Sequence, residues 1–129
     1  MVAGIGVDLV DLKRFEAELD KTPKLRERLF HSVEREYSVR QLAGSFAAKE
    51  ALVKALGSPD GLSWQEISVV RDQLGKPWLH AEGASANRIQ AAGVTKLHLS
   101  LSHDGGMLIA YVIAEGAGAL DGSEGGWDA

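Results

Sequence analysis

Cysteine is absent from the 129 residues of this chain. Its absence excludes disulfides, thiolate metal sites and cysteine nucleophiles, and it fits a reducing cytoplasm. No apolar run is long enough to cross a bilayer, and the first six residues lack the basic region and apolar core of a secretion signal. We therefore expect a cytoplasmic protein that does not associate with membranes.

The chain is long enough for one compact domain and too short for a second core. Its net charge of −4 argues against nucleic acid as the main partner. Most of the 14 Lys and Arg residues lie between positions 11 and 54, and the rest of the chain is acidic. A basic face of this kind suits an anionic ligand or an acidic protein, although a solvated helix surface is the simpler explanation.

Apolar spacing, caps and glycines predict the order of the elements. They are a strand over 2–7, a helix from the Asp11 cap to about 19, short helical pieces at Pro23 and Ser32, a long helix over 38–56 ended by Gly57, a hairpin of strands 67–71 and 78–80, a helix over about 84–92, and closing strands near 97–102 and 107–114. The final strand is apolar at nearly every position, which predicts burial on both faces, the second at a subunit contact. We expect residues 1–115 to form the domain and 116–129 a flexible tail.

Three charged side chains on the long helix are the first candidates for chemistry. Glu50 and Lys54 lie four residues apart beside small alanines, and by themselves they are an ordinary surface pair that contributes roughly 0.2–0.5 kcal/mol. Lys49 falls within the apolar stripe of the same helix, where an ammonium is costly unless it reaches water or meets an anion. This third charge favours a binding site for an anion.

Asp8 follows an apolar, glycine-rich strand, where a carboxylate can simply cap the next turn. One Asp and one Glu brought together from two elements are also the hard oxygen ligands that Mg²⁺ prefers. Nearby lysines would neutralise a phosphate leaving group. The combination of Asp8, Glu50 and the lysines therefore favours metal-assisted transfer of a phosphoryl-type group.

Ser100 to Asp104 form a third polar cluster around His103. The Gly-x-Ser-x-Gly elbow of the α/β-hydrolases is missing, and adjacent His103 and Asp104 are poorly placed for a catalytic triad. His103 is better explained as a hydrogen-bond donor to a phosphate or as a general base. Gly4 and Gly6 lack the third glycine and helix start of a dinucleotide fold, and the chain has no Walker loop.

Four short motifs follow one another in an order that resembles a known family. They are Gly4 to Val10 around Asp8, Phe46 to Ala51 followed by Lys54 and Gly57, Gly75-Lys76-Pro77, and Ser100 to His103. Together they resemble the holo-acyl-carrier-protein synthases, the small class of 4′-phosphopantetheinyl transferases, over residues 2–114. The resemblance implies an α+β fold, in which a small antiparallel sheet packs with one long and several short helices. It also implies a homotrimer that binds coenzyme A between subunits.

The implied reaction transfers 4′-phosphopantetheine from coenzyme A to a serine of an apo acyl carrier protein or carrier domain. It depends on Mg²⁺ and releases adenosine 3′,5′-bisphosphate. The resemblance also implies that the reaction supports fatty acid synthesis. Asp8 and Glu50 are expected to hold the metal, and Lys54 and Lys49 to contact phosphates. The resemblance also implies that Gly57, Gly75, Lys76, Pro77, Ser102 and His103 line the nucleotide and that Lys13 and Arg14 dock the carrier protein. Ser45 and Leu74 depart from the family pattern, because many relatives have an arginine at the first position and often an asparagine at the second.

The sequence leaves the proton acceptor open among a carboxylate-bound water, Glu50 and His103. Two rival functions use the same residues. One is a magnesium-dependent nucleotide pyrophosphatase that needs no protein acceptor. The other is a non-catalytic module whose basic helix binds an acidic protein. Neither explains all four motifs together.

Overall fold

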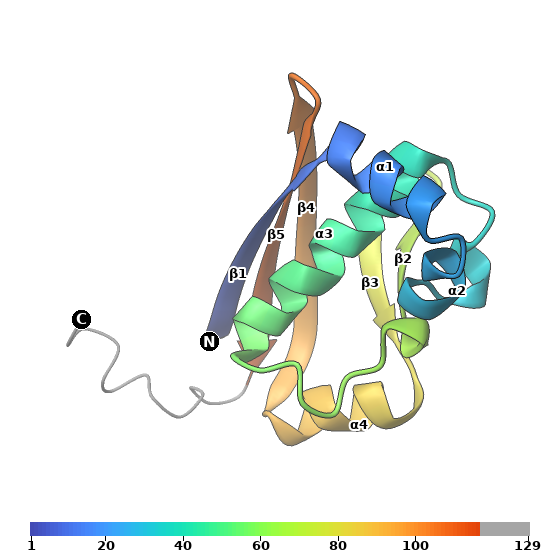
Figure 1. Cartoon of the computed structure of the whole chain (residues 1–129). Coiled ribbons are helices and arrows are strands. Elements are labelled where there is room, and N and C mark those ends of the chain that lie inside the picture. Colours follow the sequence, from blue (N-terminus) through green and yellow to red (C-terminus); the bar gives the residue numbers. More distant parts are fainter. Residues whose placement is uncertain (117–129) are drawn as a thin grey trace.

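A computed structural model describes residues 1–116 as two antiparallel sheets packed with helices, which confirms the predicted α+β class (Figure 1). The elements in chain order are β1 (Val2–Asp11), α1 (Leu12–Lys21), α2 (Leu25–Leu29), η1 (Ser32–Glu34), α3 (Val39–Leu56), η2 (Trp64–Glu66), β2 (Ile67–Arg71), β3 (Pro77–Ala81), α4 (Gly83–Ala91), β4 (Val94–Asp104) and β5 (Met107–Gly116). Strands β1, β5 and β4 form one sheet in that order, and the β2–β3 hairpin forms the other.

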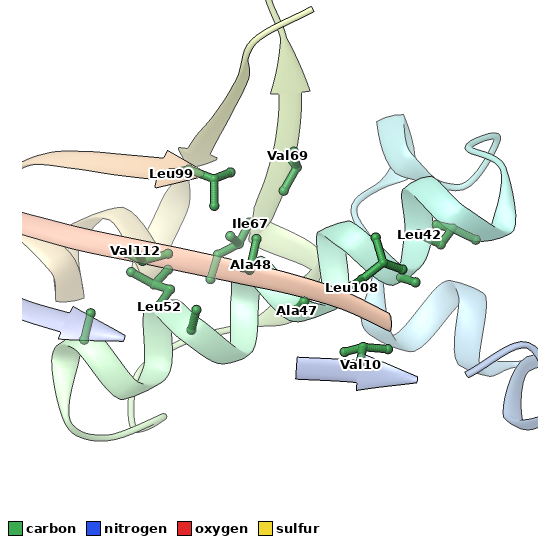
Figure 2. Packing of buried hydrophobic residues seen from close by; sticks show 14 of the residues in the cluster. Val10, Leu42, Ala47, Ala48, Leu52, Ile67, Val69, Leu99, Leu108 and Val112 are labelled. Carbon is green, nitrogen blue, oxygen red and sulfur yellow. The ribbon is translucent and has the colours of Figure 1, made fainter. Parts of the chain in front are cut away.

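The long helix α3 organises the domain. Its first turn is closed by a capping box, in which the Ser38 hydroxyl accepts from the Gln41 N–H and the Gln41 side chain accepts from the Ser38 N–H. It ends at Gly57, whose φ of +88° is the left-handed conformation that favours glycine. The helix lies across one face of the three-stranded sheet (Figure 1). Small alanines on α3 and larger side chains from both sheets fill the core between them (Figure 2).

Two glycines let β1 lie directly against α3. A Cβ atom on Gly6 would stand 1.9 Å from the Ala51 carbonyl oxygen, and one on Gly4 would stand 2.0 Å from that of Ala55. Any larger residue would push the strand away from the helix. The close approach at this glycine-rich strand is therefore made by the backbone of α3.

On strands β1 and β5, the other face of the three-stranded sheet is apolar and exposed, whereas β4 contributes Ser100 and Ser102 to it. Along β5, Leu108, Ala110 and Val112 are buried against α3, whereas Ile109 and Tyr111 are 38% and 43% exposed. On β1 the outward residues continue this surface, with Leu9 opposite Ile109 and Val7 opposite Tyr111. None of the helices within residues 1–116 covers it (Figure 1). Burial of β5 on both faces does not occur in the single chain, because strand alternation sends every second side chain outward.

Most predicted boundaries lie within two or three residues of those observed, and the largest differences are in the strands. Strand β1 continues to Asp11, paired with Met107, so Asp8 lies inside the strand and not after its end. The cap of the short turn at η1 is His31 and not Ser32, because the His31 ring accepts from the Val33 N–H. Gly116 belongs to β5, and the rest of the predicted tail lies outside the described residues.

Candidate functional site

Asp8, Glu50 and Lys54 come together where β1 crosses α3. Glycines 4 and 6 set this crossing, and Glu50 and Lys54 lie one turn apart on the helix. The Lys54 ammonium donates to Asp8 Oδ1 at 3.1 Å and to the Val7 carbonyl at 2.9 Å. The predicted cluster of two carboxylates and a lysine therefore exists within one chain.

The two carboxylates of this cluster repel one another. Partial burial raises the pKa of Glu50, the negative charge of Asp8 raises it further, and Lys54 partly offsets both effects. A cation placed between the carboxylates would relieve this repulsion. Within residues 1–116 no group of three or more His, Cys, Asp or Glu side chains forms a metal site. Mg²⁺ commonly takes only one or two carboxylates and completes its octahedron with water and phosphate oxygens, so the pair fits this ion.

A groove of about 350 Å³ opens beside the carboxylates. Its floor is apolar, with Phe15 from α1 and Phe46 from α3 at a ring separation of 5.6 Å. Arg14 lines the groove from α1, and its backbone N–H donates to the Asp11 side chain that caps this helix. Lys13 is exposed on the same helix and does not line the groove.

Lys49 occupies a different place from the one predicted. Its side chain is fully buried, and its ammonium donates to Glu34 Oε1 at 2.5 Å and to the carbonyls of Leu29 and Trp64 at 2.9 and 3.1 Å. It also lies 5.0 Å from the centre of the Phe30 ring. These contacts use all three N–H donors, so the expected contact between Lys49 and a phosphate is corrected to a structural ion pair.

Glu34 is the partner that sequence reasoning missed. Its Oε1 also accepts from the His31 N–H and its Oε2 from the Val69 N–H. Burial lowers the pKa of Lys49, and the charge of Glu34 and its hydrogen bond oppose that effect. The cost of an unpaired ammonium in an apolar stripe predicts that some anion must meet Lys49, but it does not identify which acid does so.

A second cavity of about 340 Å³ is lined by several of the residues predicted to bind the nucleotide. Gly75 and Pro77 line it from the β2–β3 hairpin, and Ser102 and His103 line it from the end of β4. Arg40 from α3 and Arg71 from β2 also line it, and sequence reasoning missed both. No motif marks these arginines, because they come from segments that meet only in the folded chain.

Two predicted nucleotide-binding residues lie outside this cavity. The Lys76 ammonium is 4.6 Å from the centre of the Trp78 ring, on the hairpin. Gly57 ends α3 and is exposed. Of the two departures from the family pattern, Ser45 is buried within α3, whereas Leu74 is 95% exposed at the hairpin turn.

Apart from Lys13, Lys49, Gly57 and Lys76, the predicted residues form two groups in one chain. The carboxylate pair and Lys54 lie where α3 crosses β1, next to the groove. The second group lies at the N-terminal part of α3 and the ends of β4 and the hairpin. Residues 40 and 44 of α3 face the second group, whereas residues 46 and 50 face the first, and these positions lie on different faces of an α-helix.

Comparisons with known proteins agree on one family. The model of the 4′-phosphopantetheinyl transferase superfamily matches residues 4–112. A holo-[acyl-carrier-protein] synthase from Clavibacter sepedonicus is 53% identical over 119 residues, which cover 92% of this chain and all of that one. The crystal structure of the holo-[acyl-carrier-protein] synthase from Neisseria meningitidis has a TM-score of 0.82 at 32% identity and covers 89% of this chain and 99% of its own. The Helicobacter pylori synthase in complex with coenzyme A has a TM-score of 0.75 at 28% identity, over 86% of this chain and 99% of that one.

Proposed function

The chain belongs to the 4′-phosphopantetheinyl transferase superfamily, among the holo-[acyl-carrier-protein] synthases, and from this membership we propose that it transfers 4′-phosphopantetheine from coenzyme A to a serine of an apo acyl carrier protein. The observation that carries the proposal is the meeting of Asp8, Glu50 and Lys54 beside a groove. Within residues 1–116 none of the helices is long and apolar enough to span a membrane. A role in fatty acid synthesis and a cytoplasmic location stay predictions.

In the proposed reaction, the serine oxygen of the carrier attacks the phosphorus next to the pantetheine. A bond forms between this oxygen and the phosphorus, and the bond from the phosphorus to the bridging oxygen breaks. Adenosine 3′,5′-bisphosphate leaves with the bridging oxygen, and the serine proton passes to a base. Glu50, with its raised pKa, or a water held by a carboxylate can accept this proton, and Lys54 can neutralise the leaving phosphate.

Asp8 and Glu50 would hold Mg²⁺, because they are two adjacent carboxylates whose mutual repulsion a divalent cation relieves. When bound, Mg²⁺ supplies electrostatic stabilisation of the charge that develops on the pyrophosphate. Lys54 keeps Asp8 in place through its hydrogen bond, and the contact of β1 with α3 fixes the separation of the two carboxylates. Because Glu50 would be both a metal ligand and a candidate base, we expect its neutralisation to reduce the transfer activity most.

We propose that the complete site forms between subunits of a homotrimer. The carboxylate cluster and the second cavity lie on different faces of α3 in one chain, so one coenzyme A molecule would bridge them most simply across a subunit boundary. The apolar outer face of β1 and β5 supplies a surface for such an assembly. His103, in the second cavity, would then approach the carboxylates of a neighbouring subunit.

The carrier protein is proposed to dock on α1. Arg14 lines the apolar groove beside the carboxylates, so an acidic partner that contacts Arg14 would bring its serine close to Glu50. Lys13 is exposed beside it and adds positive charge. The groove is lined by apolar side chains and acids beside Arg14, so its apolar part would take the apolar side of a partner helix, while Arg14 and Lys13 would contact acidic side chains of the partner.

A transfer assay tests the function. The protein is incubated with coenzyme A, Mg²⁺ and several apo carrier proteins, and each carrier is weighed by mass spectrometry. We expect a mass gain of one phosphopantetheine group, and its absence from all carriers would refute the proposal. Glu50→Gln should lower transfer about 100-fold or more, because one metal ligand and a candidate base are lost. Glu36→Gln, at an exposed position away from the site, is the matched control and should retain activity.

A further inference from the structure

The groove beside the carboxylate pair carries two opposite charges on one side of α1. Arg14 and Glu18 are exposed, and both line the groove. Four residues separate them, so their side chains lie about 40° apart around the helix axis and about 6 Å apart along it. A partner that lies along α1 in this groove therefore meets a positive charge and, one helical turn further, a negative charge.

The apolar stripe of α1 determines where these two charges lie. Phe15 and Leu19 are the buried residues of the helix, and the Phe15 ring lies 5.6 Å from an aromatic ring of α3. Arg14 and Glu18 each precede one of these buried residues, which puts both charges on the same flank of the stripe. Glu16 follows Phe15 on the other flank, where it is exposed and does not line the groove.

Neither of the two charges has a partner within residues 1–116. The ion pairs of that part of the chain include neither Arg14 nor Glu18, and neither side chain makes a hydrogen bond there. Their spacing would allow a pair within the helix, but a cation placed N-terminal to its anion is the less favourable order, because it opposes the helix dipole. Both groups therefore remain available to a partner.

Each of the other acids that line the groove has a role. Asp8 and Glu50 are the proposed metal ligands, and Asp11 Oδ1 caps α1 by accepting from the Arg14 N–H at 3.1 Å. Glu18 has neither role, and its negative charge lies in a groove that is proposed to receive an acidic protein. It opposes docking unless the partner carries a matching group at that point.

We propose that Glu18 determines which carrier proteins are accepted, by favouring a cation and disfavouring an acid one helical turn beyond the acid that meets Arg14. The inference rests on the proposed function, in which an acidic carrier docks on α1. A helix that is acidic throughout would pair with Arg14 but place a second acid against Glu18, and like charges of this kind exclude wrong partners. Glu18 acts on carrier binding and not on the reacting atoms, so its effect falls on the KM for the carrier.

A charge-reversal scan of the carrier tests the inference. In an apo carrier protein that the wild type modifies, each exposed charged residue near the acceptor serine is replaced by one of opposite sign, one at a time. We expect one position at which the wild type modifies the carrier with a cation about 2- to 10-fold more efficiently, as kcat/KM, than the carrier with an acid, the range for exposed ion pairs. Glu18→Lys should reverse this preference at the same position, and Glu18→Gln should abolish it. The KM for coenzyme A should stay the same in both variants.

Glu16→Lys is the matched control, because it makes the same charge change on the same helix outside the groove. It should keep the wild-type preference at every carrier position. The inference is overturned if no carrier position shows the reversal, or if Glu16→Lys and Glu18→Lys shift the preference equally. A wild type that transfers to no carrier refutes the proposed function instead.

Discussion

Lys49 and Glu50 are neighbours on α3, and their charged groups lie in opposite environments. Glu50 faces Asp8 and the groove, with its pKa raised by partial burial and by the Asp8 charge. Lys49 points into the core, where Glu34 and two carbonyls bind it. A step of 100° around the helix axis separates them and divides their roles. The proposed chemistry uses Glu50, whereas Lys49 forms a buried ion pair in the core.

Arg14 offers a residue-scale test of carrier docking. Charge reversal by Arg14→Glu places an acid at the edge of the groove, where it repels an acidic carrier. We expect the KM for the carrier to rise about 10-fold or more, with a much smaller change in the KM for coenzyme A. Steady-state kinetics with each substrate varied in turn measures this difference. Equal effects on both KM values would contradict the docking role.

At the scale of elements, the contact of β1 with α3 builds the site. Gly6→Ala would place a methyl group 1.9 Å from the Ala51 carbonyl, so the strand must move away from the helix and carry Asp8 with it. We expect a loss of about 1–3 kcal/mol in the free energy of unfolding, together with lower transfer activity. Urea denaturation and the transfer assay provide the two measurements.

Gly44→Ala is the matched control for this packing prediction. Its methyl group would meet the Leu101 side chain at an ordinary 3.5 Å, and it lies within α3. Alanine is favoured over glycine in a helix interior by about 1 kcal/mol, so the free energy of unfolding should stay the same or rise. Equal destabilisation by both substitutions would show that the space between β1 and α3 is not the cause.

The buried pair of Lys49 and Glu34 joins α3 to η1 and, through Val69, to β2. Lys49→Met leaves the Glu34 carboxylate buried without its cation, which costs about 3–5 kcal/mol. The double variant Lys49→Met with Glu34→Gln removes both charges, so it should recover a large part of that loss. Chemical denaturation of the single and double variants measures the coupling. Strictly additive losses would contradict an energetic link between the two side chains.

At the scale of the whole molecule, the uncovered face of the three-stranded sheet is the feature to explain. Val7 and Tyr111 are cross-strand partners on this face and are 42% and 43% exposed in the single chain. A contiguous apolar surface of this kind marks a protein contact more often than a free surface. The proposed homotrimer would bury it and bring the two groups of site residues together.

Tyr111→Asp tests this assembly. The residue is exposed in the single chain, so an aspartate there leaves the fold intact but places a charge inside the proposed interface. We expect light scattering to give a trimer for the wild type and a smaller species for the variant, with transfer largely lost. Val33→Asp, at another exposed apolar position on η1, is the control and should stay trimeric and active. A monomeric variant with full activity would refute a site between subunits.

Local sequence determined the elements and the chemical types at the site. The Ser38 capping box, the stop at Gly57 and the Asp11 cap act within a few residues, so their effects can be predicted from the chain alone. The acid at position 8 and the charged pair at 50 and 54 likewise indicated a metal and phosphate site. The family resemblance added coenzyme A and the carrier protein.

Tertiary structure decided which of these groups meet. Asp8 and Lys54 are 46 residues apart, and Glu34 binds Lys49 over 15 residues and Val69 over 35. Such contacts depend on how β1 and the hairpin pack on α3, and no local preference encodes that arrangement. For the same reason the lone arginines at 40 and 71 carried no signal in the sequence. Only the folded chain shows that Lys49 belongs to the core and that the two arginines share a cavity.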